Sequence, residues 1–351
     1  MGLIGKMRKE NSKREISPSL DLDTALGLKN FLCNRSIDVE NFVLLQGGYT
    51  STVFKAENGD QTLIIKHSRP RDSFYPIRRK MKDTRAITEF EILKKLHPLF
   101  PQQVPAIHAF FPDESVTVMS DVGQDAQLGI NYFLDGRAEL KHACALGKFL
   151  GELKEATAEW EPFKTVEQPF EQVWTRGIEV DTASEEWGQR MRDYYLNSTP
   201  GFVWPDGHPK NVFFGNAEPL IRVIDFDCSH FADQDYMLPN FLGQIPVFTA
   251  MGHISPDQGI AFTKDMIESY NKISLITPEI ERKMVFYAAT QIIQRQDGKW
   301  LFDVCGGNND EKSLLRKAFL FYLGRRILTS AETFDQYLDM FQKELHAWLD
   351  K

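Results

Sequence analysis

A carboxylate and an amide stand close together in the segment DGHPKN, residues 206–211, directly before the apolar residues 212–214. This spacing puts both side chains on one loop ahead of a predicted strand. Phosphoryl transfer needs a group that accepts the proton of the attacking hydroxyl and an oxygen ligand for Mg²⁺. Asp206 suits the first task, and the carboxamide of Asn211 suits the second.

Two further acids follow in the segment IDFD, residues 224–227, at the end of an apolar run. Magnesium prefers oxygen ligands and keeps several waters. Asp225 and Asp227 could therefore share the metal with Asn211 if the two segments pair as a hairpin. Aspartate is also common in Asx turns and at strand ends, so each acid alone has a structural explanation as well.

A lysine and a glutamate precede these segments. Lys66 ends the β-rich run TLIIKH, where an unpaired charge would be costly to bury, and Glu89 lies in a predicted helix. Lys66 could clamp two phosphates of a nucleotide while Glu89 fixes its direction. Alternatively, Lys66 is an exposed residue at a strand end and Glu89 is solvated.

A glycine-rich turn, GGYTST at residues 47–52, separates two predicted strands. Gly47 and Gly48 would let the backbone approach a ligand closely, and the hydroxyls of Ser51 and Thr52 could hold phosphate oxygens. An ordinary hairpin turn explains these residues equally well.

The elements that must position these residues begin with a β-rich region at 35–121. It contains strand-like runs on both sides of the glycine-rich turn, a hairpin signal at Asn58-Gly59 and a further predicted strand at 115–120. One predicted helix, 86–96, would present an apolar face made of Ile87, Phe90, Leu93 and Leu96. A basic tail and a short helix precede this region, within residues 1–34.

From residue 122 onward helical periodicity dominates, interrupted by two short predicted strands at 211–215 and 221–227. Predicted helices cover 136–156, 261–273, 281–294, 312–328 and 332–349. The sequence therefore predicts an α+β fold of two lobes: a small antiparallel β N-lobe at 35–121, which would bind the nucleotide, and a larger, mainly helical C-lobe at 122–351.

Composition narrows the class of protein. The 351 residues carry 41 basic and 49 acidic side chains, and 42% are hydrophobic, which excludes a disordered chain and argues against nucleic acid as a partner. No apolar run is long enough to cross a membrane or to serve as a secretory signal. Four well-separated cysteines predict reduced thiols in a cytoplasmic protein, and the oligomeric state is not indicated.

Taken in order, six segments resemble the aminoglycoside phosphotransferase and choline-kinase-like family, which has a protein-kinase-like bilobal fold. They are LLQGGYTSTVFKA, LIIKHS, TEFEILKKL, VMSDVG, DGHPKNVFFGN and VIDFD, and they extend from about residue 42 to 228. The resemblance implies a phosphotransferase that uses ATP or GTP and Mg²⁺ and modifies a hydroxyl group.

The resemblance also implies a role for each matching residue. Asp206 would take the hydroxyl proton, Asn211 and Asp225 would bind Mg²⁺ with Asp227 as an auxiliary, and Glu89 would hold Lys66 against the phosphates. The glycine-rich turn would cover the phosphates. The base would stack against a link formed by Met119, Ser120 and Asp121.

The chain departs from the family pattern beside the catalytic loop. The family usually has His-Gly before the aspartate, whereas this chain has Trp204-Pro205 before Asp206. We expect Trp204 to brace the loop by packing, unless the geometry of the loop differs. The family's Gly-Asp-Pro run after the metal-binding strand is only loosely echoed at residues 231–235.

The acceptor is the least determined part. An aminoglycoside, an amino alcohol or a sugar is expected, with Asp233, Asp235, Gln291, Arg295 and residues 306–311 as candidate contacts. The basic segment 69–85 would instead suit an anionic acceptor, such as a lipopolysaccharide-core sugar or another macromolecular acceptor, or it is simply a solvated loop. A nucleotide-binding pseudokinase is a further alternative, which the retained lysine, acids and amide disfavour.

Overall fold

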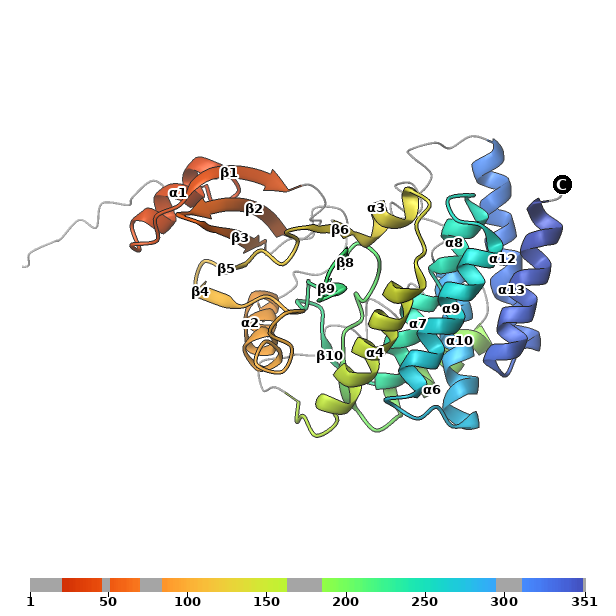
Figure 1. The fold of residues 1–351 in the computed structure, drawn as a ribbon. Coiled ribbons are helices and arrows are strands. Elements are labelled where there is room, and N and C mark those ends of the chain that lie inside the picture. Colours follow the sequence, from red (N-terminus) through yellow and green to blue (C-terminus); the bar gives the residue numbers. More distant parts are fainter. Residues whose placement is uncertain (1–20, 46–50, 70–83, 163–184, 295–310, 350–351) are drawn as a thin grey trace, which may run out of the picture.

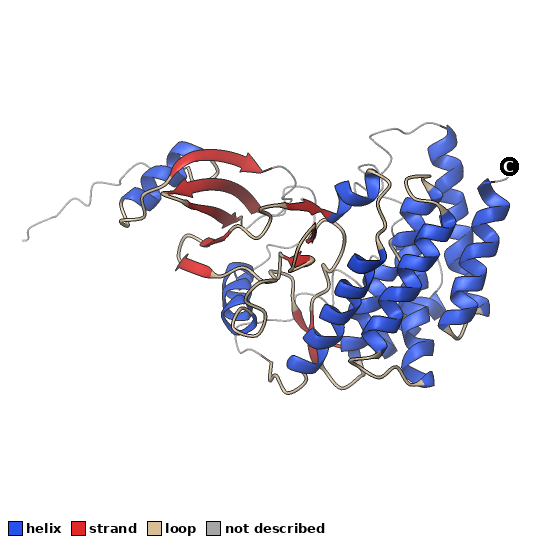
Figure 2. Ribbon diagram, viewed as in Figure 1, coloured by secondary structure: helices blue, strands red, loops and turns tan. Residues whose placement is uncertain are grey.

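A computed structural model describes residues 21–45, 51–69, 84–162, 185–294 and 311–349. The described chain forms two lobes, a sheet-containing N-lobe and a larger helical C-lobe (Figure 1). Strands gather in the N-lobe and at the junction, while the rest of the C-lobe is helical (Figure 2). The predicted α+β architecture is therefore confirmed. No helix in the described ranges is long and apolar enough to cross a membrane.

The N-lobe sheet is antiparallel, with strand order β1-β2-β3-β5-β4. The strands are β1 (Glu40–Leu45), β2 (Ser51–Asn58), β3 (Gln61–Ser68), β4 (Ile107–Phe111) and β5 (Val116–Ser120). The turn between β2 and β3 lies one residue later than the hairpin signal suggested, because Asn58 pairs with Gln61 and leaves Gly59-Asp60 as the loop. Gly59 has a φ of 58°, which glycine adopts at little cost.

Two helices flank this sheet. Helix α1 (Ala25–Cys33) starts at Thr24, whose side chain accepts a hydrogen bond from the Gly27 N–H, and it packs Leu28 and Phe31 into the sheet's own core. Helix α2 (Thr84–Leu96) packs its end into the C-lobe core instead. Its expected apolar face is only partly right, because Leu93 and Leu96 are buried while Ile87 and Phe90 are half-buried.

Short strands connect the lobes and carry the loops of interest. β8 (Val212–Gly215) pairs with β6 (Ala126–Leu128) on one side and β9 (Ile221–Val223) on the other, and β7 (Gly201–Val203) pairs with β10 (His230–Ala232). The predicted strand at 221–227 ends early, since Asp225 has a φ of 65° and leaves the extended conformation. The hairpin β8–β9 thus brings the ends of two polar loops together.

Helices make up the rest of the described C-lobe. Helix α4 packs along α9 and α7 packs against α10, while α12 and α13 lie at the far end in Figure 1. The bounds are α3 (Gly129–Leu134), α4 (Leu140–Ala156), α6 (Glu185–Leu196), η2 (Gln234–Tyr236), α7 (Met237–Leu242), α8 (Ile245–Ala250), α9 (Pro256–Asn271), α10 (Pro278–Gln294), α12 (Glu311–Ser330) and α13 (Phe334–Leu349).

Candidate active site

Lys66 lies at the centre of a buried ionic cluster between the lobes. Its Nζ is 2.6 Å from Asp225 Oδ1, 2.9 Å from Glu89 Oε2 and 3.2 Å from Asp227 Oδ2. The lysine comes from β3, the glutamate from α2 and the two aspartates from the loop after β9. The structure therefore brings together four residues from three separate segments of the chain.

Burial and charge act in opposite directions on these groups. Burial alone would lower the pKa of Lys66, but Asp225, Asp227 and Glu89 outweigh it, and its pKa is well above the ordinary value. Burial, with Asp227 and Asp225 nearby, raises the pKa of Glu89 to about 7 in spite of Lys66. Burial also raises the pKa of Asp225, whereas Lys66 and Arg85 overcome burial and lower that of Asp227.

Arg85 is a site residue that the sequence assigned only to a basic segment. Its side chain is buried, with Nη1 3.5 Å from Asp227 Oδ2, and its Nη2 donates to the Arg69 carbonyl at 3.1 Å. The available signal was its position one helical turn before Glu89, which puts both side chains on the same face of α2. The rest of the basic segment, residues 70–83, lies outside the described residues.

The loop that carries Asp206 approaches the same cluster from the C-lobe. The carboxylates of Asp206 and Asp227 and the thiol of Cys228 each place one atom within 4.8 Å of the others. The side-chain Nδ2 of Asn211 donates to the Asp206 carbonyl at 3.0 Å, and the Ile224 N–H donates to the Asn211 carbonyl at 3.0 Å. These contacts fix Asn211 between the two polar loops.

The donor set suits a hard divalent cation. Carboxylate oxygens converge on the cluster, and its four carboxylates exceed its two cations by two charges when all are ionised. Cys228, which the sequence reading did not assign to the site, adds a softer sulfur donor at the edge of the cluster. The members are Lys66, Arg85, Glu89, Asp206, Asp225 and Asp227.

Trp204 braces the two loops against each other. Its ring is buried and stacks on Phe226 with the centroids 5.2 Å apart, and its Nε1 donates to the Asp225 carbonyl at 3.0 Å. The Phe226 N–H in turn donates to Glu89 Oε1 at 3.3 Å. These contacts hold Asp225 at its positive φ, so the packing expected of Trp204 is present and an additional hydrogen bond accompanies it.

The sheet register separates the two hydroxyls of the glycine-rich turn. Ser51 pairs with Ser68 and shares the face of Lys66, whereas Thr52 pairs with His67 on the opposite face. The Thr52 hydroxyl donates to Asp23, at the start of α1. The structure thus brings Ser51 but not Thr52 to the Lys66 face, and Gly47 and Gly48 lie outside the described residues.

The expected link between the lobes follows β5. Met119 is buried and pairs with Ile64 on the same sheet face as Lys66. The Ser120 hydroxyl accepts from the Ala106 N–H at 2.9 Å, and Asp121 forms an ion pair with Lys55 at 2.8 Å. The link therefore has defined contacts, and the Met119 side chain lies on the sheet face of Lys66.

The acidic residues proposed as acceptor contacts form ion pairs inside the C-lobe. Asp233 lies 2.7 Å from the Lys283 ammonium and accepts from Tyr287, and Asp235 lies 2.6 Å from Lys154. Gln291 is fully buried and donates to Tyr236. These side chains hold the C-lobe together internally, which contradicts the expectation that they meet an acceptor; Arg295 and residues 306–310 lie outside the described residues.

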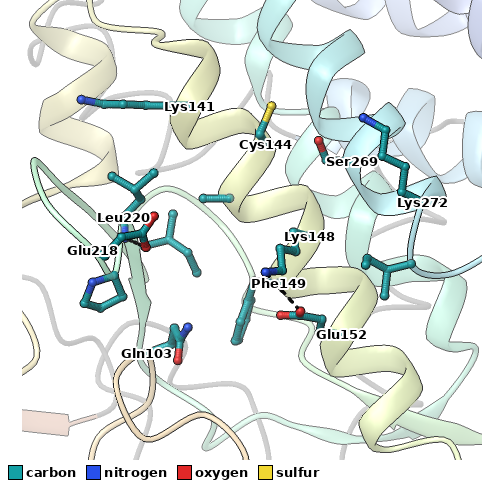
Figure 3. A pocket seen from close by; sticks show the side chains of 14 residues that line it. Gln103, Lys141, Cys144, Lys148, Phe149, Glu152, Glu218, Leu220, Ser269 and Lys272 are labelled. Atoms are coloured by element: carbon teal, nitrogen blue, oxygen red, sulfur yellow. Dashed lines mark hydrogen bonds and ion pairs between the residues drawn. The ribbon is translucent and has the colours of Figure 1, made fainter.

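A hollow of about 460 Å³ opens elsewhere on the C-lobe (Figure 3). It is formed by α4, the end of α9 and the turn between β8 and β9, with Phe149 and Leu220 beside Lys148 and Lys272. None of the residues of the ionic cluster lines it. It lies at the turn end of the β8–β9 hairpin, whereas the catalytic loops lie at the other end.

The profile of the phosphotransferase enzyme family matches residues 41–236, which is more than half of the chain and includes both polar loops. The chain belongs to this phosphotransferase family. No curated protein matches the sequence significantly. Family membership, together with the two-lobed architecture, confirms the resemblance drawn from the sequence and makes the chain a kinase of this family.

Solved structures agree on the fold. The amicoumacin kinase hAmiN, in complex with AMP-PNP, Ca²⁺ and Ami, aligns with a TM-score of 0.58 at 10% identity over 87% of this chain and 95% of that one. A choline/ethanolamine kinase family protein from Mesorhizobium loti gives 0.50 at 15% identity, covering 87% and 93%. Choline kinase from Cryptosporidium parvum gives 0.50 at 11%, covering 89% and 94%. These likenesses establish the protein-kinase-like fold.

Proposed function

We propose that this member of the family transfers the terminal phosphoryl group of ATP or GTP to a hydroxyl of a small molecule, with Mg²⁺ as the metal. The observation that carries the proposal is the convergence of Lys66 from the N-lobe with Asp206, Asp225 and Asp227 from two C-lobe loops. A lysine, a loop acid and a metal-binding acid in one cleft are the groups that phosphoryl transfer requires.

The nucleotide is assigned to the cleft face of the N-lobe sheet. Val53, Ile64 and Met119 share that face, and they would contact the base beside the Ser120–Asp121 link. Gly47, Gly48 and Ser51 would cover the phosphates, with Lys66 binding two of them. A phosphate oxygen would compete with Asp225 for the Lys66 ammonium and free that carboxylate for the metal.

The metal would be held by Asn211, Asp225 and Asp227. Mg²⁺ bound there would cancel negative charge on the transferring phosphoryl group. When all four carboxylates of the cluster are ionised, its excess of two negative charges supports binding of one divalent cation. The similar amicoumacin kinase was solved with AMP-PNP and Ca²⁺, which supports a nucleotide donor and a divalent metal here.

Asp206 would accept the proton of the acceptor hydroxyl as its oxygen attacks the terminal phosphorus. The protein then has to align the groups and stabilise charge, because phosphoryl transfer needs little covalent help. Glu89 keeps Lys66 directed into the cleft through their 2.9 Å ion pair. Every member of the cluster except Arg85, which pairs with Asp227, thus has a task in the transfer.

A small, hydroxyl-bearing amine or sugar is the acceptor class that we favour, because the similar structures include kinases named for amicoumacin, choline and ethanolamine. The described ends of the basic segment give no support to an anionic acceptor. Arg85 faces Asp227, and Arg69 lies toward Asp23 at 3.8 Å. We also propose a cytoplasmic location, supported by free thiols at Cys33, Cys144 and Cys228.

The test is acceptor-dependent nucleotide turnover. Purified protein with Mg²⁺ and ATP or GTP is screened against amino alcohols, aminoglycosides, nucleosides and sugars, and release of ADP or GDP is measured. We expect at least one acceptor to accelerate release, and Asp206→Asn to lower that rate by at least about a hundredfold without weakening nucleotide binding. Normal turnover by Asp206→Asn would refute the role of Asp206, and binding without turnover for every acceptor would favour a pseudokinase.

A further inference from the structure

The backbone on both sides of Asp206 is held by a side chain from the C-lobe core. Asn240, on α7, is fully buried, and its Nδ2 donates to the Pro205 carbonyl at 2.7 Å and to the Gly207 carbonyl at 3.2 Å. The carbonyl between them, that of Asp206, accepts from Asn211 Nδ2 at 3.0 Å. Three consecutive carbonyls of the catalytic loop are therefore bound by two asparagine side chains.

Trp204 supports the same stretch from a different direction. A Cβ at Gly207 would lie 3.0 Å from Cε3 of the indole, so the glycine backbone rests against the ring. The indole N–H is bound to the Asp225 carbonyl. The loop is thus fixed to α7 through Asn240 and to the metal-binding loop through Trp204.

The side-chain amide of Asn240 contacts the loop only through its Nδ2 donor. Its Oδ1 is buried and has no hydrogen-bond partner among the described residues, an arrangement that costs about 1–3 kcal/mol. A leucine would fill the same volume without this cost. The two hydrogen bonds to the loop are therefore the feature of Asn240 that distinguishes it from an apolar core residue.

We propose that Asn240 is a positioning residue that sets the direction of the Asp206 carboxylate. A general base must lie within hydrogen-bonding reach of the proton that it removes, and small displacements are costly. Asp206 is on a loop and is half-buried. Two hydrogen bonds from a helix in the core make the backbone on both sides of it rigid. The inference rests on the role proposed for Asp206.

Asn240→Leu, Asp206→Asn and the double variant test this inference, with Mg²⁺-ATP hydrolysis, in which water is the acceptor, as the readout. Asn240→Leu should lower kcat by about 10- to 100-fold, with the KM for ATP changed less than about threefold. In the Asp206→Asn background the same substitution should lower kcat by less than about threefold, because there is no base left to misplace.

Gln244→Met is the matched control. Gln244 is also fully buried, lies one helical turn beyond Asn240 and donates to the Asn240 carbonyl instead of the loop. It should lower the unfolding midpoint about as much as Asn240→Leu and leave kcat unchanged. If Asn240→Leu does not fold, Asn240→Ala takes its place in the cycle.

Two results would overturn different statements. An equal loss of kcat from Asn240→Leu in both backgrounds, or an equal loss from Gln244→Met, would show a purely structural effect and end the inference about Asn240. Wild-type hydrolysis and acceptor turnover by Asp206→Asn alone would instead remove the proposed function of Asp206, and the Asn240 inference with it.

Discussion

Replacing Lys66 with methionine removes a charge that contacts three carboxylates and keeps most of the side-chain volume. Glu89 and Asp227 are almost fully buried, while the Asp225 side chain is 35% exposed and is partly screened by water. Breaking a buried ion pair on one side costs about 3–5 kcal/mol. We expect a loss of this size in the free energy of unfolding at pH 8, without metal or nucleotide.

The same loss should be smaller at pH 6. The pKa of Glu89 is already about 7 and would rise further without Lys66, so this carboxyl takes up a proton in the variant instead of remaining an unpaired charge. One extra bound proton changes stability by about 1.4 kcal/mol per pH unit. Wild-type Glu89 itself gains most of a proton between pH 8 and pH 6, so the net difference is about one pH unit's worth of one proton. We therefore expect Lys66→Met to be about 1 kcal/mol less destabilising at pH 6 than at pH 8.

Urea unfolding at both pH values measures the effect, and Lys55→Met is the matched control. Lys55 lies on the neighbouring strand, 2.8 Å from Asp121, but its side chain is 43% exposed, so its loss should cost less than about 1 kcal/mol. The reasoning would be refuted if both variants lost the same stability, or if the Lys66→Met deficit did not depend on pH.

Three further predictions concern residues around the cluster. Burial lowers the pKa of His230 to about 4, so between about pH 6.5 and pH 4 only the unfolded chain gains a proton at this residue. The free energy of unfolding should therefore fall by up to about 3 kcal/mol as the pH drops to 4. Urea unfolding of His230→Gln should show a shallower dependence on acid pH, and equal slopes would contradict this. Cys228 offers a thiol beside two carboxylates, so Cd²⁺ should inhibit Mg²⁺-ATP turnover about tenfold more strongly in the wild type than in Cys228→Ser, and identical inhibition curves would exclude a bound thiol. Arg85→Ala should lower the free energy of unfolding by about 2 kcal/mol, because Asp227 loses a buried partner. Arg282→Ala breaks an exposed ion pair and should cost less than about 1 kcal/mol. Similar costs of the two variants in urea unfolding would show that Asp227 does not need Arg85.

Local sequence patterns were sufficient for the two-lobed fold and for the polar loops. Glycine, aspartate and asparagine between β-rich runs favour turns, so Asp206 and Asn211 could be placed on one loop from spacing alone. Lys66 and Glu89 could be paired because a charged residue in an apolar strand requires a partner.

Choices between faces and distant partners could not be predicted in the same way. Thr52 and Ser51 are adjacent in the sequence, and only the strand register puts them on opposite faces of the sheet. Asn240 lies within an apolar helix, and its two acceptors are more than thirty residues away in the chain. Asp233 and Asp235 looked available as acidic residues, but inside the lobe Lys283 pairs with both and Lys154 pairs with Asp235.

The division of the apolar cores has a mechanical consequence. Helix α1 shares one core with one face of the sheet, whereas Ile92, Leu93 and Leu96 of α2, like Met119 on the other face, belong to the core of the helical lobe. Helix α2 also contacts the sheet: Phe90 stacks on Phe110 of β4 with the centroids 4.4 Å apart, and Glu89 pairs with Lys66 of β3. A change in the angle between the lobes would act on these contacts. The distance between the Lys66 ammonium of β3 and the Glu89 carboxylate of α2 would then change as a ligand enters and leaves.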